Sequence, residues 1–294
     1  MPFMYPKSFD YFSPKSLSDA LELLQAGNSE TRILAGGQSL IPSPKLRSLS
    51  LKRVIDITGI EELNYTRREE RVFRIGALTT NATLESDKEV ESSFPILREA
   101  AGQIADPLVR NMGTIGGNLC HADPVNDLPA VMLALNATIV ATSKEGTRRI
   151  NADSFFIDSF KTALAPGEIL TEVEIPVAEG KIGNAYRKVK RGSGGFSIAG
   201  VGSNLSAADD GTVSNCRIAM TGVGPKATRA LEAEQSLQGK APTSSDFDNA
   251  AKLAVEASQP HTDINATESY RRKVLNKLVK EAMSAAYDRA TQVR

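Results

Sequence analysis

Two glycine-centred segments carry the residue types that could bind a diphosphate. The first glycine segment, residues 35–40, reads AGGQSL, and the second glycine segment, residues 113–118, reads GTIGGN. A diphosphate needs several main-chain N–H groups converging on its oxygens, and a Cβ at the contact would hold those groups too far away. Side chains beside the glycines add hydroxyl and amide donors, namely Gln38, Ser39, Thr114 and Asn118. A glycine pair is also the ordinary sign of a tight turn, so the two segments support nucleotide binding only together.

Two other phosphate-binding patterns fail against this sequence. A phosphate loop of the NTPase kind ends in Gly-Lys-Ser or Gly-Lys-Thr, and the chain contains neither run. The fingerprint GxGxxG of nicotinamide-binding domains is approached at Gly192, Gly194 and Gly195, but residue 197 is serine and no helix is expected there. The sequence therefore favours neither an NTPase nor a standard nicotinamide-binding domain.

Cys120 and His121 follow the second glycine segment and suggest a metal ligand or a nucleophile. Against this, neighbours on an expected strand point to opposite faces, no second His/Cys cluster completes a metal shell, and a catalytic cysteine needs a positioned base. We interpret both residues as structural, and Cys216, which lies in a strand-like run, as core. Two cysteines are too few for an iron–sulfur cluster, so no metal site is expected in this chain.

The elements that must position these segments alternate between helix and strand. Residues 16–27 predict a helix capped by Ser16 and closed by Gly27, and a strand at 31–35 leads directly into the first glycine segment. A loop between two further helices holds the second glycine segment, and the polar residues 58–71 are expected to be connection. The remaining expected elements are helices at 92–105 and 128–135 and strands at 54–57, 72–77, 137–142 and 169–175.

The chain changes character at the polar stretch 177–184, which we interpret as a domain boundary. Strand-like runs follow at 185–190, 196–205 and 213–223, and helices are expected at 227–238, 246–257 and 270–290. The last helix is amphipathic, because its apolar residues recur at helical spacing while Lys and Arg occupy the other face. This order of elements indicates a mixed α+β protein of two domains.

Composition excludes several functional classes. Of the 294 residues 41% are hydrophobic, which is enough for a substantial core. Lys plus Arg equals Asp plus Glu at 35 each, Trp is absent and aromatics make up 5%, so neither a nucleic-acid nor a membrane surface is indicated. No apolar run is long enough to span a membrane, and the start lacks the apolar stretch of a signal peptide, so we expect a cytoplasmic protein.

Five motifs, in order, resemble the FAD-binding medium subunit of the xanthine oxidase or molybdenum hydroxylase family, and carbon monoxide dehydrogenase medium subunits look most similar. They are AGGQSLIPSPKLR, TIGGNLCHADPVNDLPAVMLAL, GEILTEVEIP, YRKVKR and ESYRRKVLNKL. The resemblance implies an N-terminal FAD-binding domain of the vanillyl-alcohol-oxidase (PCMH) type over residues 1–176, with α+β lobes at about 1–58 and 59–176. It also implies a smaller C-terminal domain over residues 177–294, with a three-stranded antiparallel sheet and helices.

The resemblance further implies which residues contact a non-covalently bound FAD. The glycine segments and their neighbours would enclose its diphosphate: Ile33, Leu34, Ala35, Gly36, Gly37, Gln38, Ser39, Leu40, Gly113, Thr114, Ile115, Gly116, Gly117 and Asn118. Asp127, Leu170 and Lys188 match single contact positions, whereas Ile104 and Phe196 stand where relatives carry an aromatic residue and a tyrosine. From the residues alone, Asp127 could instead cap the helix after it, Leu170 could be core, and Lys188 could be a solvated charge.

The same resemblance implies electron transfer rather than substrate chemistry, and thus no catalytic residue in this chain. A large subunit would carry the molybdenum cofactor and a small subunit the [2Fe–2S] clusters, while this chain would pass electrons from FAD to an external acceptor, in a dimer of heterotrimers. Two alternatives stay open, namely a free-standing flavin oxidoreductase and a cofactor-free bridging subunit. Many such oxidases tether FAD to a histidine in the first loop, and residues 35–42 contain none.

Overall fold

A computed structural model describes residues 8–27, 29–45, 51–192 and 194–292 of the chain. Its strands are β1 Asp10–Phe12, β2 Thr31–Leu34, β3 Arg53–Asp56, β4 Thr66–Arg68, β5 Val72–Gly76, β6 Thr138–Ser143, β7 Gly146–Asn151, β8 Phe156–Asp158, β9 Lys161–Thr162, β10 Ile169–Pro176, β11 Lys181–Lys190, β12 Ser197–Ala207, β13 Val213–Thr221 and β14 Thr228–Arg229. Its helices are α1 Leu17–Gln25, α2 Pro42–Lys45, a 3₁₀ turn at Glu61–Leu63, α3 Asn81–Ser86, α4 Lys88–Ser93, α5 Pro95–Ala101, α6 Pro107–Met112, α7 Ile115–His121, α8 Leu128–Ala134, α9 Ala152–Phe155, α10 Leu231–Leu237, α11 Ser244–Ala257 and α12 Glu268–Thr291.

The strands of the described residues form three sheets of three or more strands and one two-stranded ribbon, β8-β9. The first sheet has the order β1-β3-β2, the second β4-β5-β10-β6-β7, and the third β11-β12-β13-β14. Only the first sheet is parallel, as its β1–β3 and β2–β3 pairs show. Because the carboxyl ends of its strands lie at one edge, the first glycine segment leaves the sheet there, directly after β2.

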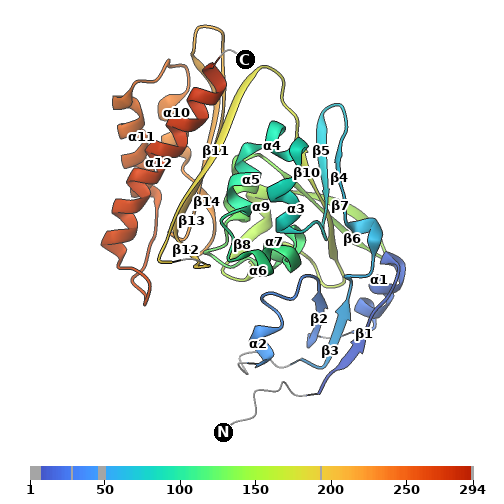
Figure 1. Cartoon of the computed structure of the whole chain (residues 1–294). Helices are drawn as coiled ribbons and strands as arrows, with labels where there is room; N and C mark the ends of the chain where they lie inside the picture. Colours follow the sequence, from blue (N-terminus) through green and yellow to red (C-terminus); the bar gives the residue numbers. More distant parts are fainter. Residues whose placement is uncertain (1–7, 28, 46–50, 193, 293–294) are drawn as a thin grey trace.

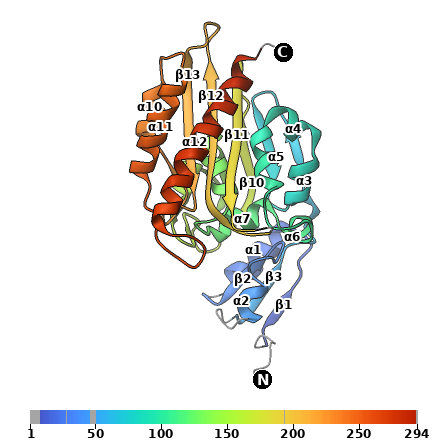
Figure 2. The same cartoon turned by 60° about the vertical axis from the view of Figure 1, so that its left-hand side comes forward.

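The sheets and helices are stacked in layers. Helices α3, α5, α7 and α8 lie between the second sheet and the third, and α10, α11 and α12 cover the other face of the third sheet (Figure 1). Turned by 60°, the molecule shows α12 crossing over β11, β12 and β13, while the small first sheet extends away from the rest (Figure 2). These middle helices, α3, α5, α7 and α8, therefore connect the N-terminal part of the chain to the third sheet, which we call the C-terminal sheet.

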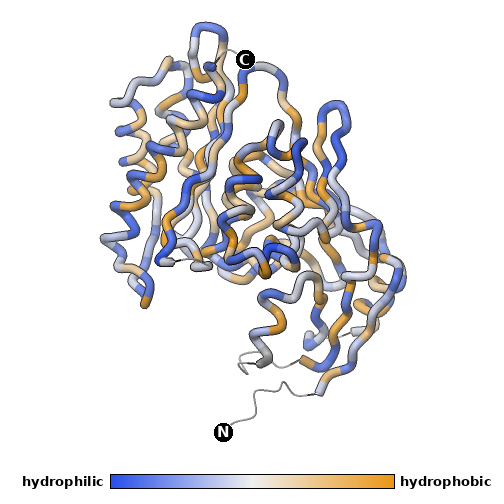
Figure 3. The backbone as a smooth tube through the Cα atoms, viewed as in Figure 1, coloured by the Kyte–Doolittle hydropathy of each residue, from blue (hydrophilic) through white to orange (hydrophobic). Residues whose placement is uncertain are grey.

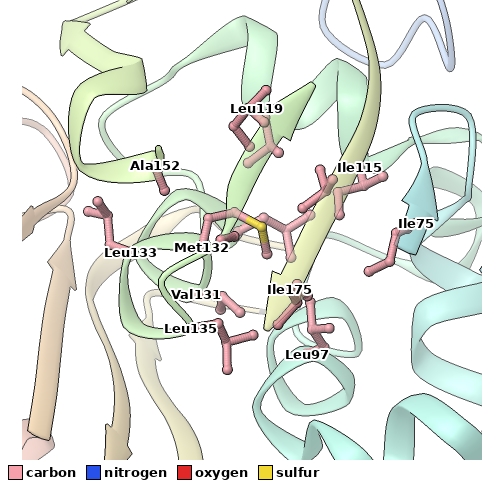
Figure 4. Packing of buried hydrophobic residues seen from close by; sticks show 14 of the residues in the cluster. Ile75, Leu97, Ile115, Leu119, Val131, Met132, Leu133, Leu135, Ala152 and Ile175 are labelled. Carbon is pink, nitrogen blue, oxygen red and sulfur yellow. The ribbon is translucent and has the colours of Figure 1, made fainter. Parts of the chain in front are cut away.

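The largest hydrophobic core surrounds helix α8, in which every residue is buried. Its side chains pack with those of α7, β5, β10 and α5, and representative members are Ile75, Leu97, Ile115, Leu119, Val131, Met132 and Ile175 (Figure 4). Burying one such side chain contributes about 1.5–3 kcal/mol relative to leaving it exposed. The hydrophilic residues instead mark solvent-facing places such as the turn between β4 and β5 (Figure 3). Among the described residues no helix is both long and apolar enough to cross a membrane.

In the N-terminal part, the predicted helices and strands are present, but some of their bounds differ from the prediction. Helix α1 begins after Ser16, whose side chain accepts a hydrogen bond from the Asp19 N–H, as predicted. The helix expected over 92–105 is instead two helices, because Pro95 begins α5 and the residue before a proline, Phe94, is held out of the helical conformation at φ −137°. The connection expected over 58–71 contains the 3₁₀ turn and β4, which pairs with β5.

The C-terminal part follows the predicted order with one added strand. The three long antiparallel strands are present, and β14 adds a two-residue fourth strand beside β13. It occupies the start of the helix expected at 227–238, so α10 begins only at Leu231. Strand β7 was also missed, because its sequence GTRRIN carries little apolar alternation. The division between residues 176 and 177 stays a prediction.

Candidate functional site

One cavity of about 870 Å³ borders both glycine segments. Its walls come from the first glycine segment, from α6 and α7, from the β8-β9 ribbon and β10, and from the C-terminal sheet at Lys188 and residues 194–196. The volume lies toward the upper end of the 300–1,000 Å³ range of ligand and cofactor sites. Segments that are far apart in the sequence therefore meet around one space large enough for an extended ligand.

The first glycine segment offers a run of free main-chain donors to this cavity. Within the described chain, the N–H groups of residues 36–40 donate no hydrogen bond, and all five residues line the cavity. Gly37 adopts φ +72°, a conformation that glycine reaches without a steric cost. Successive unpaired N–H groups in such a turn form a concave donor surface that suits an anion. Residues 36–40 therefore combine unpaired main-chain donors with a position at the cavity wall, and their contact with a diphosphate stays a prediction.

The two glycine segments touch each other at Gly36. A Cβ built on Gly36 would lie 1.9 Å from the carbonyl oxygen of Met112 and 2.8 Å from the Cα of Gly113. Both atoms belong to the main chain, so no side-chain rotation could relieve the overlap. Glycine at position 36 is therefore required by the close approach of the segments, independently of any ligand.

The second glycine segment is built differently from the prediction, because it is not a loop with free amides. Thr114 is the N-cap of α7, and its hydroxyl accepts a hydrogen bond from the Gly117 N–H at 3.1 Å. The Gly116 N–H donates to the Ala77 carbonyl at 2.9 Å, and a Cβ on Gly116 would lie 2.8 Å from the Ala77 Cβ. The expectation that amides at 116 and 117 are available to a ligand is therefore wrong, since the protein itself uses both.

Side chains remain the polar contribution of the second glycine segment. Thr114 and Asn118 both line the cavity. The Oδ1 atom of Asn118 is buried without a hydrogen-bond partner, and so is that of Asn81, another residue of the cavity wall. A buried amide oxygen without a partner costs about 1–3 kcal/mol, so a ligand that supplies a donor here would be stabilised.

Asp127 and Lys188, which are 61 residues apart, form an ion pair of 2.7 Å at the cavity wall. The alternative that Asp127 caps α8 is wrong, because its side chain makes no cap hydrogen bond. The alternative that Lys188 is a solvated charge is also wrong, because only 1% of its side chain is exposed. An unpaired charge at this depth would be costly, so each residue depends on the other.

Most of the other predicted site residues also line the cavity. Leu170 belongs to the core and also lines the cavity, with 3% of its surface exposed, so a place in the core does not exclude contact with a ligand. Ile104 and Phe196 lie in the wall, and Phe196 remains 66% exposed. Only two of the predicted residues lie outside the wall: Leu34, and Ile115, which is fully buried in the main core.

Several cavity residues were missed or set aside by sequence reasoning. Cys120 and His121 line the cavity from helix α7, so their interpretation as neighbours on a strand was wrong. Desolvation by the surrounding protein raises the pKa of the Cys120 thiol to about 12, which keeps it protonated although it opens onto the cavity. Among the described residues no group of three or more His, Cys, Asp or Glu side chains could hold a metal ion.

Phe160 is the missed residue with the most unusual conformation. It lines the cavity, is 61% exposed and adopts φ +57°, which is rare for a bulky residue. Its N–H donates to the carbonyl of Ala122, itself at φ +49°, and its ring lies 5.3 Å from that of His121. No sequence pattern marks such a conformation, because neither residue is glycine or asparagine.

Comparisons with known proteins find similar proteins over nearly the whole chain. Residues 7–178 match the family described as the FAD binding domain in molybdopterin dehydrogenase, and residues 184–286 match the CO dehydrogenase flavoprotein C-terminal domain. The carbon monoxide dehydrogenase medium chain of Hydrogenophaga pseudoflava is 38% identical over 97% of this chain and 99% of its own. The glyceraldehyde dehydrogenase medium chain of Sulfolobus acidocaldarius is 39% identical over 95% of this chain and 98% of its own.

A solved structure extends the similarity to three dimensions. Carbon monoxide dehydrogenase from Hydrogenophaga pseudoflava, in a form that lacks the Mo-pyranopterin moiety of the molybdenum cofactor, superposes with a TM-score of 0.94. The match has 40% sequence identity and covers 97% of this chain and 99% of that chain. The chain therefore belongs to the FAD-binding medium subunits of the molybdenum hydroxylase family, which are oxidoreductase subunits.

Proposed function

We propose that the cavity binds FAD non-covalently and that residues 36–40 hold its diphosphate. The observation that carries this proposal is a run of five residues that line the cavity and whose main-chain N–H groups have no acceptor in the described chain. A diphosphate carries negative charge and several acceptor oxygens, which match such a donor surface. The hydroxyl of Thr114 and the amide of Asn118 border the same space from the second glycine segment.

The remainder of the cavity also fits a dinucleotide. The unpartnered amide oxygens of Asn81 and Asn118 suit a ligand that has hydroxyl and amine donors, as the ribityl, ribose and adenine groups of FAD do. Apolar wall residues such as Ile104, Leu170 and Phe196 suit a flat ring. We place the isoalloxazine near the C-terminal sheet, at the seam between domains 1–176 and 177–294, and the diphosphate at the first glycine segment.

The proposed role of the chain in its complex is electron transfer. When bound, FAD can take up electrons from an iron–sulfur cluster and release them to an acceptor. The chain would bind and orient the cofactor, while a small subunit would carry the [2Fe–2S] clusters and a large subunit the molybdenum cofactor, in a dimer of heterotrimers. The similarity to medium chains of a carbon monoxide dehydrogenase and a glyceraldehyde dehydrogenase supports this assembly, and a cytoplasmic location stays a prediction.

Isolation of the native complex tests the proposed function. The tagged chain should co-purify with two partner chains, show flavin absorption bands, and release one FAD per copy on acid precipitation. The partner chains, identified by mass spectrometry, should include one that carries molybdenum and one that carries iron. A chain purified alone with its own oxidase activity would favour the free-standing flavin enzyme. A complex without flavin would favour the bridging subunit.

A further inference from the structure

In the part of the chain that the structure describes, the donors to the Asp127 carboxylate all come from the C-terminal sheet. Its Oδ1 accepts hydrogen bonds from the Tyr186 hydroxyl at 2.5 Å and from the Ser197 hydroxyl at 2.6 Å. Its Oδ2 accepts one from the Lys188 ammonium at 2.7 Å. Tyr186 and Lys188 lie on β11 and Ser197 begins β12, whereas Asp127 precedes α8. The four residues form a polar cluster that joins the N-terminal part of the chain to the third sheet.

The cluster is almost completely shielded from water. The exposed fraction is 4% for Asp127, 0% for Tyr186 and 2% for Ser197, and only 1% of the Lys188 side chain is exposed. Hydrogen bonds to a charged group at such depth contribute more to stability than hydrogen bonds at the surface. Removing one donor leaves the buried carboxylate with an unsatisfied acceptor, which costs free energy. The geometry of Asp127 therefore depends on the two hydroxyl groups.

The two hydroxyl groups determine which oxygen of Asp127 binds Lys188. They occupy Oδ1, so Lys188 is confined to Oδ2. A second N–H of the Lys188 ammonium points to the Gln103 carbonyl at 3.3 Å. An ammonium has three donors, so one is left, and both Lys188 and Asp127 line the cavity. The hydroxyls thus set the position of a positive charge and of a free acceptor site on Oδ2 at the cavity wall.

Ser197 also fixes the adjacent wall. It is the first residue of β12 and directly follows residues 194–196, all of which line the cavity. Its hydrogen bond to Asp127 attaches that stretch to the start of α8. Loss of this hydroxyl would therefore release both the carboxylate and the stretch that ends at Phe196.

We infer that Tyr186 and Ser197 are positioning residues that hold the Asp127–Lys188 pair against the cofactor, so that FAD binding requires the C-terminal sheet to be docked. The inference rests on the proposed function. The two residues would act through Asp127, because neither of them lines the cavity. Binding of FAD and docking of the sheet then strengthen each other, because each requires the same arrangement of Asp127 and Lys188.

A double-mutant cycle on the full chain tests the inference. FAD is removed, and its Kd is measured by fluorescence for the wild type, Ser197→Ala, Tyr186→Phe, Asp127→Asn, and each hydroxyl variant combined with Asp127→Asn. We expect Ser197→Ala and Tyr186→Phe each to raise the Kd about tenfold, the equivalent of one hydrogen bond to a charged group. In the Asp127→Asn background each effect should fall below about twofold, because the group through which they act has changed.

Asp153→Asn is the matched control. Asp153 also pairs across the same junction, with Arg217 at 2.8 Å and Arg229 at 3.0 Å, but none of the three lines the cavity. This variant should lower the unfolding temperature while leaving the FAD Kd and the flavin absorption bands unchanged. Ser197→Ala, by contrast, should raise the FAD Kd and shift the flavin absorption bands. Ser197→Ala removes a single oxygen, so it remains informative even where Tyr186→Phe does not fold.

Three results would overturn the inference. The first is an unchanged Kd in Ser197→Ala, and the second is an effect of equal size with and without Asp127→Asn. The third is a control variant that weakens FAD binding as much as Ser197→Ala does, because a merely structural junction would then explain the data. Failure of the proposed function is distinct, because the wild-type full chain would then bind no FAD at all.

Discussion

Replacing Gly36 with alanine should separate the two glycine segments without altering any side chain that faces the cavity. The new Cβ would stand 1.9 Å from the Met112 carbonyl oxygen, whereas ordinary contact begins at 3.4 Å, so the main chains must move apart by about 1.5 Å. Overpacking of this kind costs about 1–3 kcal/mol of stability. Gly36 does not have a positive φ, so the backbone conformation itself adds no penalty.

The same shift sets the expected loss of cofactor. A hydrogen bond of about 2.9 Å that lengthens by more than 1 Å is no longer a hydrogen bond. Losing two bonds to a charged diphosphate costs at least about 3 kcal/mol, which corresponds to a rise of more than 100-fold in the Kd for FAD. Gly116 is a poorer probe, because a side chain there collides with Ala77 in the core and would unfold the protein as well.

The assay is fluorescence titration of the FAD-free full chain, with circular dichroism to verify the fold. Gly224→Ala serves as the control, because a Cβ there meets only the Lys226 carbonyl oxygen at 3.6 Å and the residue does not line the cavity. It should bind FAD like the wild type. A folded Gly36→Ala variant with wild-type affinity would refute the assignment of residues 36–40 to the diphosphate.

Three further changes have expected outcomes. Ala122→Gly should stabilise the protein by up to about 1 kcal/mol, because Ala122 adopts φ +49°. The control Ala285→Gly, inside α12, should destabilise the protein by about as much. Thermal unfolding of the two variants checks this, and stability changes of the same sign would contradict the prediction. Burial holds the pKa of His121 below its ordinary value against the opposing effect of Asp123, so the unfolded chain binds the proton more readily and stability is lost as the pH falls below about 6.5. His121→Gln should therefore flatten the dependence of the unfolding free energy on pH between 7 and 5, and an unchanged slope would contradict the shift. Lys188→Met should destabilise the protein by about 3–5 kcal/mol, because it leaves the Asp127 carboxylate buried without its counter-ion, and Lys188→Met combined with Asp127→Asn should recover part of the loss in urea unfolding; a double variant no more stable than Lys188→Met would argue against the pair.

The local features of the site were readable from the sequence because they depend on neighbouring residues. The strand before the first glycine segment, the helix after Ser16 and the amphipathic α12 each follow from a pattern within one stretch of chain. The free amides of residues 36–40 follow in the same way, since a turn that carries two glycines keeps its main chain open. Recognition of the family also came from ordered motifs and is confirmed by the comparisons.

Only the tertiary structure decided which groups are available to a ligand. Gly116 and Gly117 read as a second open loop, but their amides are taken by Ala77 and Thr114, the first of which lies on a distant segment. From the residues alone Asp127 could also have been a helix cap, yet its hydrogen-bond partners are 59, 61 and 70 residues away. A hydrogen bond satisfied across the fold leaves no trace in local spacing, because any segment with a suitable donor could supply it. The sequence by itself thus determined where donors could stand. Contacts with segments distant in the chain, near β5 for Gly116 and in the C-terminal sheet for Asp127, determined which polar groups are already used by the protein.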